Sequence, residues 1–203
     1  MSQLNRGMGL VALVIVLSAG AAQSEQSTLK SAKGTTRPTK ANPDALVLQD
    51  FKHRVEQYVE LHKKAAKKSP PLKETTDTAK IKAAQQVLAD TIQSARTGAR
   101  RGDIFTPAVS RKFKQLMYTE LKGPDARETK KVIKEDAPSP AVVPLKVNTH
   151  YPEAAPLSTV PPNLLERLPQ LPPQVDYRIV GKALLLRDVD ANLIVDYIPN
   201  AIQ

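Results

Sequence analysis

Three oxygen-bearing side chains near the C-terminus, Asp188, Asp190 and Asn192, stand at every second position of the stretch LLLRDVDANLIVDY. This is the spacing of the first three ligands of an EF-hand calcium loop, which also needs a glycine at its sixth position and a glutamate at its twelfth. Those two positions hold Leu193 and Pro199 here. Asp and Asn also favour tight turns, because their side chains bond nearby backbone groups. The stretch therefore predicts a turn between two strands rather than a metal site.

The histidines do not form a metal-binding pattern with one another. His53 and His62 are nine residues apart, which places them on roughly opposite sides of a helix. No H-E-x-x-H sequence and no cysteine accompany them, so zinc has few ligands. His62 continues an apolar helix face, and we expect its ring to be buried and hydrogen-bonded at the edge of the core. No metal or cofactor site is predicted.

Ser158 and Thr159, with His150 nearby in the sequence, come closest to a nucleophile and its base. No G-x-S-x-G elbow surrounds them, and neither GxGxxG nor GxxxxGK[ST] occurs among the eight glycines. Ser158 stands shortly before a Pro-Pro step, where serine commonly caps a short helix. No catalytic residue is predicted. A small hydrolase whose site combines His150, Ser158 and the turn aspartates stays open as an alternative.

The segment 1–21 has the features of a secretory signal peptide. Arg6 precedes an apolar run over residues 8–17, and small residues follow that run. The run is shorter than the roughly 20 apolar residues that span a bilayer. We expect cleavage after Ala21, or alternatively after Ala22, and a periplasmic or secreted protein with no membrane span. The sequence contains no cysteine, so the core must hold the exported domain together without disulfides.

The formal net charge of +10 is unevenly distributed along the chain. Basic residues exceed acidic ones over residues 50–136, whereas residues 137–203 hold five basic and six acidic residues. Lys and Arg of this kind mainly solvate the outer faces of helices, although a basic face would also attract an anionic polymer. Nucleic acid is not expected as a partner, because the protein is expected to be exported. In addition, an aromatic content of 4% leaves few rings on which bases could stack.

Two regions differ in composition ahead of the proline-rich part. Residues 22–42 are polar and small, and predict a disordered tether. In residues 43–136, apolar side chains recur every three or four positions, which predicts a small bundle of three to four helices. Helix starts are indicated by Thr76-Asp77, by Thr106-Pro107 and by the Gly123-Pro124 step before a short charged helix.

Ten prolines fall between residues 137 and 173, too many for regular helix or a central strand. Many aliphatic residues stand among them, which is unlike a disordered linker. We expect an ordered, extended segment laid over the helices, with one short helix near residues 162–168. The sequence LPQLPP raises the alternative of a proline-rich ligand for a groove-type module.

The C-terminal residues change to the pattern of strands. Residues 177–180, 183–186 and 193–198 are rich in β-branched, aromatic and aliphatic side chains, and Gly181-Lys182 suits a two-residue type II′ loop. These features predict a three-stranded antiparallel meander. Such a sheet needs a packed face, so residues 137–203 are expected to pack on the helices and to form one α+β domain with 43–136.

Several blocks of the chain together resemble a family of uncharacterised exported bacterial proteins. The blocks are FKHRVEQYVELHK, ARRGDIFTP, VPLKVNTHYPEAAPLSTVPPNLLERLPQLPP and YRIVGKALLLRDVDANLIVDYIPNAI. The resemblance implies a bacterial, exported protein. It implies no activity and carries over no functional residue.

The sequence thus favours a non-enzymatic binding or structural component of the bacterial envelope. Its partner is unknown, and an envelope protein or an anionic envelope polymer would both fit an exported, basic protein. Two alternatives remain open from the sequence. One is the small exported hydrolase with a site assembled from distant residues, and the other is a basic helical face that binds anionic envelope polymers.

Overall fold

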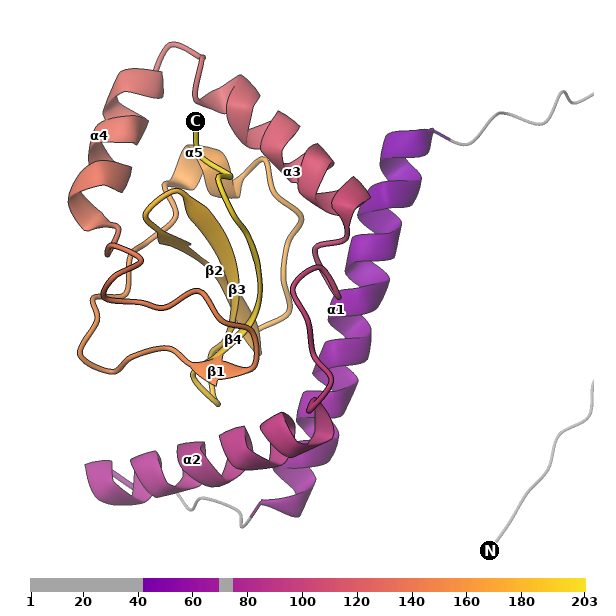
Figure 1. Ribbon diagram of the computed structural model, residues 1–203, viewed down its shortest axis with the longest axis vertical. Helices are drawn as coiled ribbons and strands as arrows, with labels where there is room; N and C mark the ends of the chain where they lie inside the picture. The colour runs from indigo at the N-terminus through magenta and orange to yellow at the C-terminus, as the bar shows by residue number, and fades with distance from the viewer. Residues whose placement is uncertain (1–41, 70–74) are drawn as a thin grey trace, which may run out of the picture. The chain divides into compact units, whose positions relative to one another are not determined.

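The computed structural model describes residues 42–69 and 75–203, and these form an α+β fold of helices around one antiparallel sheet (Figure 1). The predicted signal peptide and nearly all of the predicted tether lie outside the described residues. The elements are α1 (Pro43–Lys68), α2 (Thr78–Ala95), α3 (Pro107–Glu120), α4 (Ala126–Asp136), β1 (Thr149–His150), α5 (Pro162–Leu165), β2 (Val175–Val180), β3 (Ala183–Asp188) and β4 (Leu193–Ile198). No helix in these two ranges is long and apolar enough to cross a membrane.

Helices begin where the local sequence signals predicted. The side chain of Asp77 accepts hydrogen bonds from the amides of Ala79 and Lys80 at the start of α2. The hydroxyl of Thr106 accepts from an amide in the first turn of α3, and Pro107 occupies the first helical position. The described helices number five: four lie within residues 43–136, and the one-turn helix α5 lies where the sequence predicted a short helix near residues 162–168.

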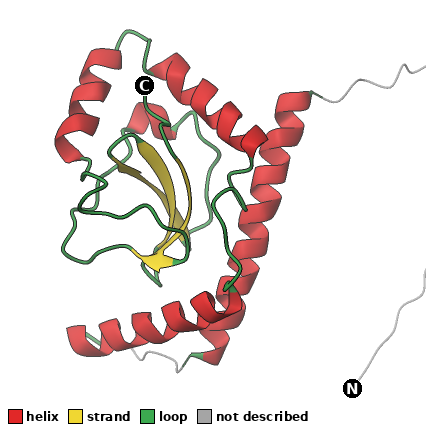
Figure 2. Ribbon diagram, in the orientation of Figure 1, coloured by secondary structure: helices red, strands yellow, loops and turns green. Residues whose placement is uncertain are grey.

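The sheet has the strand order β1-β4-β3-β2, and every pair is antiparallel. Figure 2 shows the sheet in yellow among the red helices. Strands β2, β3 and β4 form the predicted meander. The short strand β1, which the sequence did not predict, adds to the free edge of β4. Gly181 adopts a φ of 55° in the two-residue loop between β2 and β3, a conformation that suits glycine.

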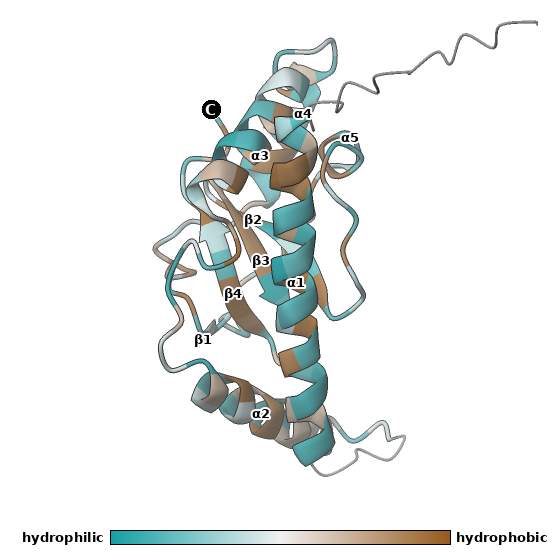
Figure 3. Ribbon diagram, turned by 90° about the vertical axis from the view of Figure 1, so that its right-hand side faces the viewer, coloured by the Kyte–Doolittle hydropathy of each residue, from teal (hydrophilic) through white to brown (hydrophobic). Residues whose placement is uncertain are grey.

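The helices cover one face of the sheet. The rings of Phe51, Phe105, Phe113 and Tyr177 pack together, with centroids 4.8 to 6.1 Å apart along the cluster. This aromatic cluster joins α1, α3 and β2 in the main core. Figure 3 shows the outward side of α1 mostly in hydrophilic colours, so the helix is amphipathic as its periodicity predicted.

The first part of the proline-rich segment lies on the opposite face of the sheet. Val143, Tyr151 and Ala155 form a second apolar cluster with Leu185 and Ile194 of the strands. This placement differs from the expected position over the helices. The later part of the segment does reach the helix side, where Leu164 of α5 is buried in the main core. Helices on one side and the proline-rich segment on the other thus enclose the sheet.

Candidate functional site

The turn that resembled a calcium loop ties the sheet to α1. Asp188, which is fully buried, accepts hydrogen bonds at one oxygen from the Tyr58 hydroxyl and His62 Nδ1, each at 2.6 Å. Its other oxygen accepts from the amide of Ala191 at 2.7 Å. The second ring nitrogen of His62 lies 3.3 Å from Asp190. Both oxygens of Asp188 are therefore occupied by donors of the protein itself.

The electrostatics of this cluster favour the hydrogen bonds that it makes. The hydrogen bond to Asp188 raises the pKa of His62, against burial of the ring, which lowers it. Burial, followed by the charge of Asp188, raises the pKa of Tyr58 well above its ordinary value. The phenol therefore stays protonated and keeps donating. As the sequence predicted, His62 is buried, with 4% of its surface exposed.

A second buried carboxylate on the same face holds a loop that the sequence did not single out. Asp196 accepts hydrogen bonds from the amides of Gly102, Ile104 and Phe105, at distances between 2.8 and 3.2 Å. The carboxylate is fully buried on β4. One side chain thus satisfies three amides of the loop before α3 and fixes that loop against the sheet.

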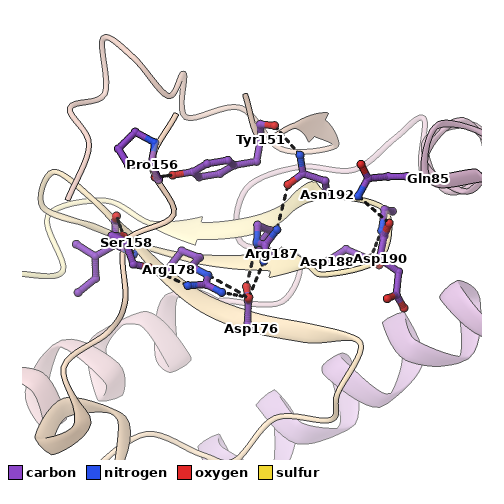
Figure 4. A network of polar contacts seen from close by, with 12 residues as sticks. Gln85, Tyr151, Pro156, Ser158, Asp176, Arg178, Arg187, Asp188, Asp190 and Asn192 are labelled. Atoms are coloured by element: carbon purple, nitrogen blue, oxygen red, sulfur yellow. Dashed lines mark hydrogen bonds and ion pairs between the residues drawn. The ribbon is translucent and has the colours of Figure 1, made fainter. Parts of the chain in front are cut away.

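On the other face, Asp176 lies between two arginines (Figure 4). Arg178 donates to it at 2.6 Å and Arg187 at 2.8 Å. Arg187 also donates to Asn192, whose amide group donates to the carbonyl oxygen of Tyr151. This network fastens the proline-rich segment to the β3–β4 turn. The sequence signal for this network is the spacing of Asp176 and Arg178, which stand two residues apart and therefore on the same face of β2.

The structure gives no contact between Ser158 and His150, the candidate residues of the hydrolase alternative. Ser158 is buried, and its hydroxyl donates to the carbonyl oxygen of Ile179 and accepts from the amide of the same residue. His150 is exposed on β1, where its ring faces Gln86 of α2. The expectation that Ser158 caps α5 was wrong, since the position before that helix is Pro161 and no side chain caps it. Ser158 instead bonds the backbone of Ile179 and so covers that position at the outer edge of β2.

Next to Ser158, a groove of about 470 Å³ runs beside β2. One wall is formed by residues 175–178 of the strand. The other is formed by Thr159 and Val160, Leu165 of α5, and residues 169–171. Consecutive residues of the strand line this β2 groove, although their side chains alternate between the two faces of the sheet. The groove therefore follows the edge of the sheet and not one of its faces.

A larger cleft, of about 710 Å³, lies between α1 and α2. Lys64 and Lys68 line it, but so do Glu60 and Asp90. Its mixed charge does not select an anion. Elsewhere in the helical region, several basic side chains are already paired with carboxylates, as Lys112 is with Asp44 at 2.6 Å. The basic helices therefore offer no concentrated anion site in this cleft.

Within residues 42–69 and 75–203, no group of three or more His, Asp or Glu side chains is arranged to hold a metal ion. The chain matches no protein-family model, no curated protein and no solved structure. The resemblance to exported bacterial proteins therefore stays a prediction. Among the features described above, the β2 groove is the one that combines an exposed apolar side chain, that of Leu165, with the edge of a strand.

Proposed function

We propose that this protein is a non-enzymatic binding component of the bacterial envelope and that it holds its partner in the β2 groove. Export is inferred from the N-terminal sequence, and binding from the groove. The observation that carries the proposal is an open groove that combines an apolar wall with the edge of a strand. Leu165 is 49% exposed on that wall, whereas its neighbour Leu164 is fully buried.

The use of the other polar groups supports a binding role over a catalytic one. Asp188 and Asp196 are buried and accept donors from the protein at both oxygens. Ser158 bonds the backbone of a strand. A general base or nucleophile must instead reach a substrate. These groups hold elements together, and the β2 groove leaves side chains available to a partner.

Site-specific cross-linking tests the proposal in bacterial cells that express the protein. A photoreactive amino acid replaces Leu165 in one variant and Leu46, which is exposed to a similar extent outside the groove, in the control. We expect a discrete envelope adduct from position 165 that position 46 does not give. Combining a cross-linker at Thr159 with Leu165→Asp is expected to remove the adduct.

Two results would contradict the proposal. The first is an adduct pattern at position 165 that is the same as at position 46, since both side chains are exposed but only one lies in the groove. The second is retention of the protein in the cytoplasm when cells are fractionated. Leu165→Asp is expected to lower the free energy of unfolding by only about 1 kcal/mol, because half of the leucine side chain is already exposed. A lost adduct therefore reports binding and not folding.

A further inference from the structure

Strand β2 is an edge of the sheet, and its alternation shows which backbone groups point outward. In an antiparallel pair, alternate residues direct N–H and C=O to the neighbouring strand, and the residues between them direct theirs away. Ile179 bonds the hydroxyl of Ser158, and the amide of Gly181 bonds the carbonyl oxygen of Pro138. The carbonyl oxygen of Gln174, in contrast, accepts from Val189 on the β3 side. The odd-numbered residues of β2 therefore face away from β3.

Three outward groups of β2 are left without a partner in the part of the chain that the structure describes. They are the N–H and C=O of Tyr177 and the C=O of Val175. The amide of Val175 already donates to the carbonyl oxygen of Pro172. Val175 and Tyr177, the residues that carry these groups, line the β2 groove. The unpaired groups end before Ile179, whose N–H and C=O are both bonded to the hydroxyl of Ser158.

We infer that the β2 groove binds an extended peptide segment, whose backbone pairs with β2 at Tyr177 and Val175. The inference rests on the proposed binding function and names the chemical class of the partner. An extended backbone supplies the alternating acceptor and donor that an open strand edge needs. The hydroxyl of Ser158 already mimics such a partner, because it both donates to and accepts from Ile179.

The residues that line the groove determine the polarity and charge of the peptide side chains that it favours. Val160, Leu165 and Leu171 stand opposite the strand and favour an apolar side chain on that side of the peptide. The carboxylate of Asp176 is already bonded to Arg178 at 2.6 Å and to Arg187 at 2.8 Å, so it is not free to pair with a basic residue of the peptide. We therefore expect a neutral or apolar contact segment rather than a basic one.

The same walls disfavour a second copy of this protein as the occupant. Edge-to-edge pairing of two sheets would bring another β2, with its own flanking residues 159–171, against this edge. Ser158 and the segment around it stand beside the strand and narrow the approach. A single extended segment is thinner than a sheet with its covering loops. The groove thus fits one strand of peptide.

A displayed library of random twelve-residue peptides provides the probe. The library is selected on the purified protein and counter-selected on Leu165→Asp. We expect peptides that bind the unaltered protein at least about ten-fold more tightly than the variant, since an aspartate carboxylate would be desolvated against the apolar wall. Amide hydrogen exchange then reports pairing. Addition of the peptide is expected to protect the amide of Tyr177, whereas the amide of Arg178, which faces β3, should change little.

Backbone methylation of the selected peptide separates pairing from side-chain anchoring. N-methylation at the positions that face β2 should weaken binding about ten-fold each, and N-methylation at the intervening positions by much less. Binding without this alternation and without protection of Tyr177 would overturn the inference while leaving the proposed function intact. So would a library that yields no peptide although position 165 still gives its envelope adduct.

The oligomeric state completes the test. Protection of the Tyr177 amide that grows with protein concentration in the absence of peptide, together with a dimer in light scattering, would show that a second copy occupies the edge and would overturn the inference. A monomer whose Tyr177 amide exchanges quickly until peptide is added supports it.

Discussion

The helix-covered face of the sheet and the outer edge of β2 treat polar groups in opposite ways. On the helix-covered face, Asp188 and Asp196 are buried and their oxygens accept from side chains and amides of three other segments. At the edge, the backbone of Tyr177 has no partner among the described residues, although its side chain is buried. We call the helix-covered face around Asp188 and Asp196 the closed region, because its carboxylates are bonded within the protein. The edge of β2 at Tyr177 is the open region, because its backbone groups have no partner among the described residues.

This difference separates structural from functional polarity. A buried carboxylate without donors would cost several kcal/mol, so the fold surrounds both aspartates with N–H and O–H groups. An edge amide beside an open groove can bond water instead and costs little. The two buried carboxylates are thus satisfied within the fold, whereas Tyr177, whose backbone groups have no partner among the described residues, lines the β2 groove.

The largest effect that would test this comparison comes from Asp196→Ala. The substitution leaves the amides of Gly102, Ile104 and Phe105 without their acceptor in the core. We expect the free energy of unfolding to fall by about 4 kcal/mol, because each buried unsatisfied donor costs roughly 1–3 kcal/mol. Urea unfolding followed by circular dichroism measures the change.

Asp103→Ala provides the matched control in the same loop. The carboxylate of Asp103 is exposed and accepts one amide, that of Arg100, at 2.8 Å. Its loss is expected to cost less than about 1 kcal/mol. Equal effects of the two substitutions would mean that the closed region does not depend on its buried carboxylate.

Ser158→Ala is expected to have an intermediate effect. It removes the hydroxyl that bonds both backbone groups of Ile179 and so extends the open part of the edge by one residue. We expect a loss of about 1–2 kcal/mol in the free energy of unfolding. The amide of Ile179 should exchange faster, at a rate closer to that of Tyr177. Hydrogen exchange read residue by residue measures both amides.

Thr159→Val is the control for this experiment, since Thr159 is exposed and adjacent. Loss of its hydroxyl should leave the exchange of Ile179 unchanged. If Ser158→Ala also left that exchange unchanged, the hydroxyl would not be what closes this part of the edge.

The parts of the fold that local rules determine could be predicted from the sequence. Asp77 and Thr106 were identified as helix caps because a cap acts on amides two or three residues away. The strands of the meander were found by their composition, and Gly181 marked the tight loop between two of them. The turn at Asp188 was distinguished from a calcium loop by the glycine and the glutamate that it lacks.

Features that depend on distant partners could not be predicted. The two residues of β1 are too few to show a period, and they pair with Ile194 and Leu193 far along the chain. Ser158 was expected to act on the helix that follows, but its partner Ile179 lies twenty-one residues further on. The β2 groove is formed by segments that are separate in the sequence, so no local pattern predicts it. The adjacent leucines Leu164 and Leu165 indicate only that a one-turn helix cannot bury both side chains on the same side.

The smallest effect concerns the charge of His62 in the closed region. Its ring faces Asp188 and Asp190, and Tyr58 shares the carboxylate of Asp188. The folded protein raises the pKa of His62, so protonation stabilises the fold. This contribution is fully present below the unfolded value of about 6.5 and is lost as the pH rises through the raised folded value. The free energy of unfolding should therefore fall as the pH rises above about 6.5.

Comparison with His62→Gln isolates this contribution, because glutamine does not titrate. The difference in unfolding free energy between the unaltered protein and the variant should shrink as the pH rises. The effect is small because the neutral ring still donates from Nδ1 to Asp188 and weakens only its contact with Asp190, whose side chain is 60% exposed. His53→Gln, an exposed change on the same helix, is the matched control for replacing a histidine by glutamine. A difference that grew with pH would mean that the ring is neutral in the folded protein and that Asp188 is stabilised by Tyr58 and the Ala191 amide alone.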